Sequence, residues 1–145
     1  MTIAASASYA AITSVRYTDQ GIWLPELVVL TVPIHTISES NAREHWAVKA
    51  KRTKLHRVTT SRAVGTVDRV GDFAERGTYA AITLTRNGAR KLDDDNLRGS
   101  LKAIRDGVTD GMGLKNDSDP RLRWDYAQEV GKGYSVEITM VLRWE

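Results

Sequence analysis

Aspartates are concentrated in one short part of this 145-residue chain, and seven of them lie between positions 93 and 119. Asp93 and Asp95 stand two positions apart just before a predicted helix, where an extended backbone would point both side chains to the same side. Asp117 follows that helix and can reach back toward the pair. Carboxylates held close together repel each other unless a cation lies between them. Oxygen ligands without His or Cys partners favour Mg²⁺, or Mn²⁺ as its substitute, over zinc.

Three carboxylates around one or two such ions suit phosphodiester hydrolysis, because the metal activates water and neutralises charge on the phosphate. The same helix carries Arg98, Lys102 and Arg105 at i, i+4 and i+7. A lysine near the metal would stabilise the phosphate in the transition state. Lys102 also stands four residues before Asp106, so the alternative is an ordinary surface ion pair between these two side chains. Both interpretations stay open, since acidic residues at helix starts are common for electrostatic reasons alone.

A basic segment precedes the acidic one along the chain. Seven Lys and Arg side chains lie between Arg43 and Arg62, opposed only by Glu44. The pattern predicts a helix that Asn41 caps, with Glu44 three residues on, and that runs to about Thr59. Its apolar face is narrow, so most basic side chains must face outward. This charge distribution suggests a surface for polyanions and a separate cation site, although two solvated surfaces of opposite charge would give the same pattern.

Strands must position these two helices. Alternating or β-branched segments predict strands at residues 11–17, 28–32, 78–86, 122–126 and 134–142. The second helix begins near Asp95 or Asn96. Its apolar stripe consists of Leu97, Leu101, Ile104 and Val108. Gly131-Lys132-Gly133 predicts a hairpin between the last two strands, and residues 61–77 are expected to be irregular, with room for a short helical turn. The order of elements indicates an α+β fold, with a mixed or antiparallel β-sheet covered by two main helices.

Length and composition bound the remaining classes. A chain of 145 residues, 41% of them hydrophobic, has room for a single domain with a real core, and residues 1–10 are expected to be loose. No apolar stretch is long enough to span a membrane, and no basic residue precedes the Ala/Ser-rich start as it would in a secretory signal. The absence of cysteine excludes disulfides and Cys-ligated zinc and fits a reducing cytoplasm.

The chain resembles the RusA family of Holliday junction resolvases, and most closely the RusA-like proteins of bacteriophages and prophages. The motifs that carry this resemblance are Ser40-Asn41-Ala42-Arg43-Glu44-His45-Trp46, Asp93-Asp94-Asp95-Asn96-Leu97, the helix with Lys102 and Asp106, Gly113-Leu114-Lys115-Asn116-Asp117 and Asp119-Pro120-Arg121-Leu122. The resemblance covers roughly residues 28 to 143 and is strongest between residues 93 and 128.

The resemblance implies roles for individual residues. The family's metal ligands fall on Asp93, Asp95 and Asp117. Its lysine lies three residues after the asparagine, a position that is Gly99 in this sequence. Counted backwards from Asp117, however, the lysine falls on Lys102, which lies about one helical turn further on and on the same side of the helix. An acidic residue that precedes the last ligand in the family is replaced by Asn116.

The resemblance also implies an activity and partners. The family consists of Mg²⁺-dependent homodimers that cut four-way DNA junctions with one active site per subunit, in keeping with the two-fold symmetry of a junction. The phosphate contacts would come from Arg43, Lys49, Arg52, Lys54, Arg57 and Arg98. Trp46, His45 and His56 would either contact the DNA or pack against the protein. No nucleotide cofactor is expected, and the cytoplasm, that of a bacterial host for a phage protein, is the expected location.

Two alternatives use the same residues. The departures at Gly99 and Asn116 would also suit a junction-binding module that has lost turnover. A nuclease for flaps or other branched DNA would need the same ligands and the same basic helix. Binding without nicking would favour the first alternative, and a panel of branched substrates would distinguish the second.

Overall fold

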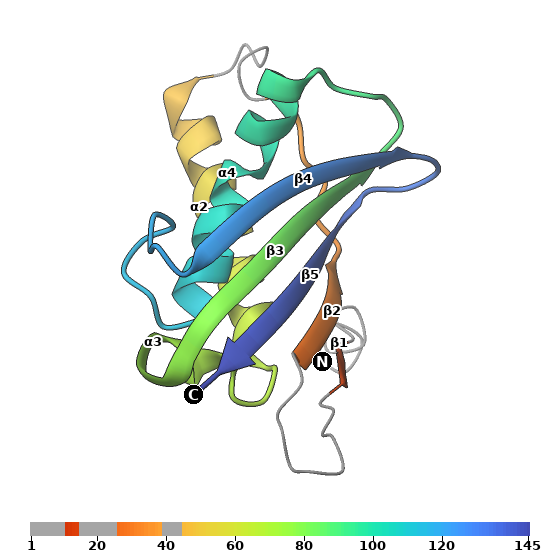
Figure 1. The fold of residues 1–145 in the computed structure, drawn as a ribbon. Helices are drawn as coiled ribbons and strands as arrows, with labels where there is room; N and C mark the ends of the chain where they lie inside the picture. Colours follow the sequence, from red (N-terminus) through yellow and green to blue (C-terminus); the bar gives the residue numbers. More distant parts are fainter. Residues whose placement is uncertain (1–10, 15–25, 39–44) are drawn as a thin grey trace, which may run out of the picture.

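The computed structural model describes residues 26–38 and 45–145 and the backbone of residues 11–14. A five-stranded sheet carries helices on one face, where α2 and α4 lie side by side (Figure 1). The predicted α+β fold, a mixed sheet covered by two main helices, is therefore confirmed. The predictions for residues 1–10, for the cap at Asn41 and for Arg43 concern positions outside the described residues. None of the described helices is long and apolar enough to cross a membrane.

The strands follow the order β1-β2-β5-β3-β4 across the sheet. Their bounds are Ala11–Ser14 for β1, Glu26–Val32 for β2, Gly77–Gly88 for β3, Leu122–Val130 for β4 and Ser135–Trp144 for β5. β3 pairs parallel with β4 and antiparallel with β5, so that Ile82 is opposite Trp124 on one side and Met140 on the other. Alternate residues of β2, β3 and β5 are buried, and the core lies between this face and the helices.

The predicted hairpin between the last two strands is wrong, because β3 lies between them. The chain leaves β4 through Gly131, whose N–H donates to the carbonyl oxygen of Gly88 at the end of β3 (3.0 Å). Gly133 then adopts a φ of 84°, which glycine accommodates without strain, and β5 returns along the other edge of β3. The glycines therefore predict that the chain reverses its direction after β4. They do not indicate whether the next strand pairs with β4 or with another strand. The parallel pairing of β3 with β4 requires a long crossover, which α4 supplies.

The basic helix α2 spans Trp46–Gly65 and is longer than predicted, so that residues 61–65 are helical rather than irregular. His45 caps it, because its Nδ1 accepts a hydrogen bond from the N–H of Ala47 (3.2 Å). Its buried side chains are His56, Thr60, Ala63 and Val64. All four lie in the second half, so tertiary packing extends a helix whose own sequence pattern is weak. The short elements that follow are the 3-10 turn η1 (Val70–Asp72) and α3 (Phe73–Arg76).

Helix α4 spans Asp94–Gly111. The predicted apolar stripe is confirmed, because Leu97, Leu101, Ile104 and Val108 are all buried. α4 approaches α2 closely at Gly107, where an added Cβ atom would lie 2.5 Å from the carbonyl oxygen of Arg57. The two helices therefore form one tight pair, whose outer surface joins the basic segment to the acidic one.

Candidate functional site

Asp117 binds two basic side chains of α4. Its Oδ2 accepts hydrogen bonds from Lys102 Nζ at 2.9 Å and from Arg105 Nε at 2.6 Å. Lys102 Nζ also donates to Asp106 Oδ1 at 2.9 Å, so the surface pair considered for these two residues is present. The loop that carries Asp117 therefore returns to the middle of α4, and one lysine joins two carboxylates there.

Lys102 and Arg105 keep the carboxyl group of Asp117 ionised. Partial burial by itself raises the pKa of this carboxyl, but the hydrogen bonds and positive charges of Lys102 and Arg105 outweigh it and lower the pKa. The hydrogen bond to Asp106 is the largest cause of the raised pKa of Lys102, opposed by partial burial and reinforced by Asp117. Both partners of the Lys102–Asp117 bond are therefore ionised at neutral pH.

Arg105 connects Asp117 to two aromatic residues of β4. Its Nη1 donates to the hydroxyl of Tyr126 at 2.6 Å, and its guanidinium lies 4.7 Å from the ring centroid of Trp124. Trp124 Nε1 in turn donates to the backbone oxygen of Asp117 at 3.0 Å. The Arg98 guanidinium lies 5.1 Å from the ring centroid of Tyr126. The spacing in the sequence predicts that both arginines lie in one stripe of the helix. It does not predict their aromatic partners, because these belong to a separate strand.

Asp93 caps α4 with both of its carboxylate oxygens. Oδ1 accepts from the backbone N–H of Asn96 at 2.9 Å and Oδ2 from the Asn96 side-chain Nδ2 at 3.0 Å. Asn96 Oδ1 accepts from Ser38 Oγ at 2.6 Å, which ties the start of the helix to the segment after β2. Asp95 lies exposed in the first helical turn. The predicted extended backbone from Asp93 to Asp95 is wrong, because only Asp93 is extended and the helix begins at Asp94.

The three aspartates predicted as metal ligands do not form one group. Within residues 26–38 and 45–145, no three His, Cys, Asp or Glu side chains are placed to hold a metal ion. Asp95 and Lys102 are seven helical residues apart, a rise of about 10 Å, and Asp117 is bound at Lys102. The donor chemistry nevertheless fits Mg²⁺, because all three side chains offer carboxylate oxygens. For Asp117 to become a ligand, it must exchange its bonds to the two cations for the metal.

A groove of about 470 Å³ lies between α2 and α4 beside this cluster. Its lining residues are Trp46, Lys49, Ala50, Thr53, Lys54, Arg57 and Asp106. Asp106 belongs to the groove and also, through Lys102, to the cluster around Asp117. The sequence suggested that the basic surface and the acidic residues are separate, whereas the fold links the groove to Asp117 through Asp106 and Lys102.

The predicted phosphate contacts differ in their surroundings. Lys49 and Lys54 are exposed and line the groove. Arg57 also lines it, but its guanidinium makes two bonds to the carboxylate of Asp110, at 2.6 and 3.0 Å. Arg52 is half-buried on α2. The two lysines are therefore the cations of this set that the groove presents most directly.

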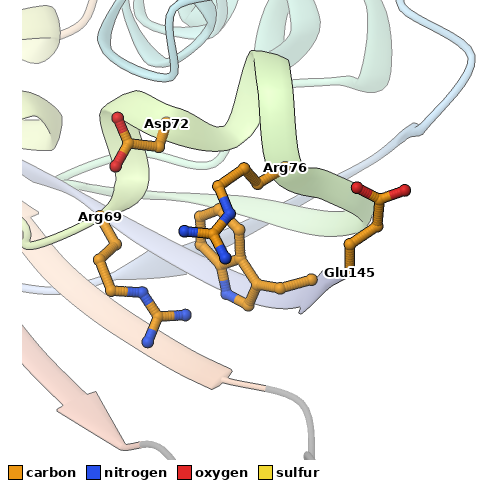
Figure 2. Close-up of a pocket in the computed structure, with 5 residues that line it drawn as sticks. Arg69, Asp72, Arg76 and Glu145 are labelled. Atoms are coloured by element: carbon orange, nitrogen blue, oxygen red, sulfur yellow. The ribbon is translucent and has the colours of Figure 1, made fainter.

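A second pocket, of about 190 Å³, lies at the end of β5 and was not predicted from the sequence. Its lining residues are Arg69, Asp72, Arg76, Trp144 and Glu145 (Figure 2). Two of these residues contact the buried carboxylate of Glu26, which accepts from Trp144 Nε1 at 2.9 Å and lies 3.7 Å from the Arg69 guanidinium. Arg69 has a φ of 70°, unusual for a residue with a side chain. The contacts of Glu26 with Arg69 and Trp144 neutralise the buried carboxylate and join β2 to β5.

Comparison with known proteins identifies no family for this chain. No family model matches the sequence, and no curated protein matches it. A solved structure described as a "putative translation initiation inhibitor" from Salmonella typhimurium has 15% sequence identity and a TM-score of 0.28, with 93% of this chain and 98% of that chain covered. A TM-score this low does not establish a common fold. The class that fold and site define is an α+β protein with a charged cluster beside a cationic groove.

Proposed function

We propose that this protein is a Mg²⁺-dependent endodeoxyribonuclease that cuts branched DNA, with the four-way junction as its substrate. The observation that carries the proposal is the Lys102–Asp117 bond, which joins the helix and the loop on which the RusA-like motifs lie. Asp106 connects this bond to a groove lined by lysines, which supports a polyanionic substrate beside the carboxylates. An α+β fold serves many activities, so the fold itself does not indicate this one.

Asp93 and Asp95 would hold the ion at the start of α4, and Asp117 would join them only after exchanging its bonds to Lys102 and Arg105 for the metal. When bound, Mg²⁺ activates the attacking water and neutralises charge on the phosphate and the leaving oxygen. Asp95 is the exposed ligand in the first turn of α4, and Asp93 would share its oxygens between the ion and the helix cap. Hard carboxylate ligands on a helix start and a loop make the site suited to Mg²⁺ rather than zinc.

The side chains around the ligands have separate tasks. Lys102 remains positively charged and would stabilise the negative charge that develops on the phosphate. Lys49 and Lys54 would bind phosphates of the DNA arms and position the junction without reading its bases. Arg105 holds Asp117 and Trp124 and would fix the loop. A homodimer would place two such sites on the two strands that a symmetric junction presents for cutting.

The test is cleavage of a synthetic four-way junction across a Mg²⁺ titration, with wild type compared to Asp95→Asn. The variant should bind the junction and fail to cut it, because a ligand is lost while the phosphate contacts remain. Asp94→Asn is the matched control, since it removes the same charge from the same exposed turn and should cut normally. Equal cutting by wild type and Asp95→Asn would contradict the proposal.

A second candidate is a junction-binding protein without turnover. Two observations favour it: Asp117 is bound by Lys102 and Arg105, and the family's lysine position is Gly99. Salt-sensitive junction binding with no nicking in Mg²⁺ or Mn²⁺ would select this candidate. Cutting of flaps in preference to four-way junctions would instead identify a nuclease for other branched DNA.

A further inference from the structure

Trp46 is the most exposed large apolar side chain in the described part of the protein, with 74% of its surface accessible. It begins α2, directly after the cap residue His45, in the half of the helix that projects toward solvent. Single exposed apolar residues are ordinary on protein surfaces. Trp46 differs in that it forms one wall of the groove between α2 and α4.

The groove uses one continuous side of α2. Its α2 residues are Trp46, Lys49, Ala50, Thr53, Lys54 and Arg57. They lie at i, i+3, i+4, i+7, i+8 and i+11, the spacing at which side chains share one face of a helix. The other large exposed apolar residues of α2, Val48 and Leu55, do not line it. The aromatic ring and the two lysines therefore follow one side of α2 along the groove. We call this side of the groove, from Trp46 to Arg57, the channel.

The charge of this channel is positive. Lys49 and Lys54 line it against one carboxylate, that of Asp106, while the Asp110 carboxylate offsets the charge of Arg57. Lys102 binds the Asp106 carboxylate at 2.9 Å, which further offsets its negative charge. The channel thus offers a flat aromatic surface, small neighbours at Ala50 and Thr53, and cations three and eight residues further along.

We propose that this channel binds an unpaired nucleotide of DNA, with the base stacked on the indole of Trp46 and the adjacent phosphates at Lys49 and Lys54. Stacking on aromatic side chains is tolerant of sequence because every base has a π-face, and cations that follow the backbone complete such sites. A paired duplex keeps its bases stacked on one another and offers no free base face for the indole, so that it would bind here through its phosphates. The channel would therefore discriminate unpaired from paired DNA.

This inference deepens the proposed function and rests on it for the identity of the partner as DNA. A four-way junction can have all of its bases paired, so the nucleotide at Trp46 would have to leave its pair at the branch point, where stacking is interrupted. Asp106 links the channel to Lys102 and Asp117. A nucleotide held at Trp46 would anchor a branch at one end of the groove, whose other end carries Arg57 and Asp106 and so contacts the candidate catalytic cluster. Selectivity for branched DNA would then come from α2, whereas cutting would come from α4 and the loop after it.

The experiment measures binding of a labelled single strand, and of the same strand annealed to its complement, in EDTA at one fixed salt concentration. Trp46→Ala should weaken single-strand binding about 5- to 100-fold and leave duplex binding unchanged, because only the base stack is removed. Trp46→Phe should retain most of the single-strand affinity, since it keeps an aromatic face. Leu55→Ala removes another exposed apolar side chain of α2, outside the channel, and should change neither affinity.

The outcomes separate this inference from the proposed function. Single-strand binding by Trp46→Ala at the wild-type level, or an equal loss for strand and duplex, would overturn the inference even if the junction is cut. The expected pattern in a protein that cuts no substrate would support the channel and contradict the nuclease. A wild-type protein that binds neither strand nor duplex would contradict both. Circular dichroism of each variant verifies folding, which the exposure of Trp46 should leave intact.

Discussion

Lys102 Nζ lies 2.9 Å from Asp117 Oδ2, although fifteen residues separate the two in the chain. The bond joins α4 to the loop that follows it, and a second bond from the same nitrogen reaches Asp106 at the edge of the groove on α2. One ammonium group thus touches both halves of the candidate site. Under the proposed function, its position favours Lys102 over position 99 for the lysine that stabilises the phosphate.

If Lys102 has this role, removing the lysine at position 102 should slow cleavage, and adding one at position 99, one helical turn away, should restore part of the rate. Lys102→Ala should lower the cleavage rate of a four-way junction about 10²- to 10³-fold, the usual cost of losing one preorganised charge at a transition state. Gly99→Lys, introduced into the Lys102→Ala variant, should restore part of the rate, because space is open around Gly99. Single-turnover cleavage, with binding measured separately, distinguishes the two effects. Lys115→Ala, an exposed lysine of the following loop, serves as the control; an undiminished rate in Lys102→Ala would exclude the role.

The groove lysines predict a change in salt dependence. If Lys49 and Lys54 each neutralise one phosphate, Lys49→Ala with Lys54→Ala should weaken duplex binding at low salt. The slope of log affinity against log salt concentration should become shallower by about 1.8, from the release of two fewer counterions. Fluorescence anisotropy at several salt concentrations measures this slope. Lys132→Ala, in the exposed connection between β4 and β5, should leave the slope unchanged; an unchanged slope in the double variant would place the phosphates elsewhere.

Asp117 predicts a loss of stability in acid. Its pKa in the folded protein lies below its ordinary value of 3.8. A carboxyl with a depressed folded pKa stabilises the protein above the unfolded pKa, and this stabilisation is lost as the pH falls through the folded value. Between about pH 5 and pH 2, the free energy of unfolding of wild type should therefore fall more than that of Asp117→Asn. Urea denaturation at each pH measures the difference. Asp125→Asn, an exposed aspartate of β4, should behave as wild type does; parallel curves for wild type and Asp117→Asn would contradict the prediction.

The elements with one regular face could be predicted from the sequence, because each depends on local period alone. The stripe that begins at Leu97 and the alternation in β5 are both buried as expected. The position of β4 could not be predicted, since Gly131 marks a reversal whichever strand lies beside it. The pairing of β3 with both β4 and β5, and the bond of the Gly131 N–H to Gly88, show that the chain crosses the end of β3.

In the candidate site, too, contacts within one helix could be predicted from the sequence, whereas contacts between elements could not. The pair between Lys102 and Asp106 lies within one helix and follows from the spacing of four residues. The bonds of Arg105 to Asp117 and to the Tyr126 hydroxyl join three elements, so that no spacing in the sequence indicates them. The role of Asp93 as a cap could not be predicted either. An aspartate just before a helix can bind a metal or accept a hydrogen bond from a backbone N–H, and the sequence is the same in both cases.

The close approach of α2 and α4 predicts opposite effects for one substitution at two glycines of α4. An alanine Cβ at Gly107 would lie 2.5 Å from the Arg57 carbonyl oxygen and 2.7 Å from Thr60 Cβ, so Gly107→Ala must push the helices apart. We expect a loss of about 1–3 kcal/mol in the free energy of unfolding, as for other overpacked sites. Gly99→Ala, where no atom lies within 4 Å of the added Cβ, should instead gain up to about 1 kcal/mol from the higher helix propensity of alanine. Both values come from urea denaturation. Because Arg57 borders the groove, Gly107→Ala should also weaken DNA binding, whereas Gly99→Ala should not; stabilisation by both substitutions would mean that the helices do not pack in this way.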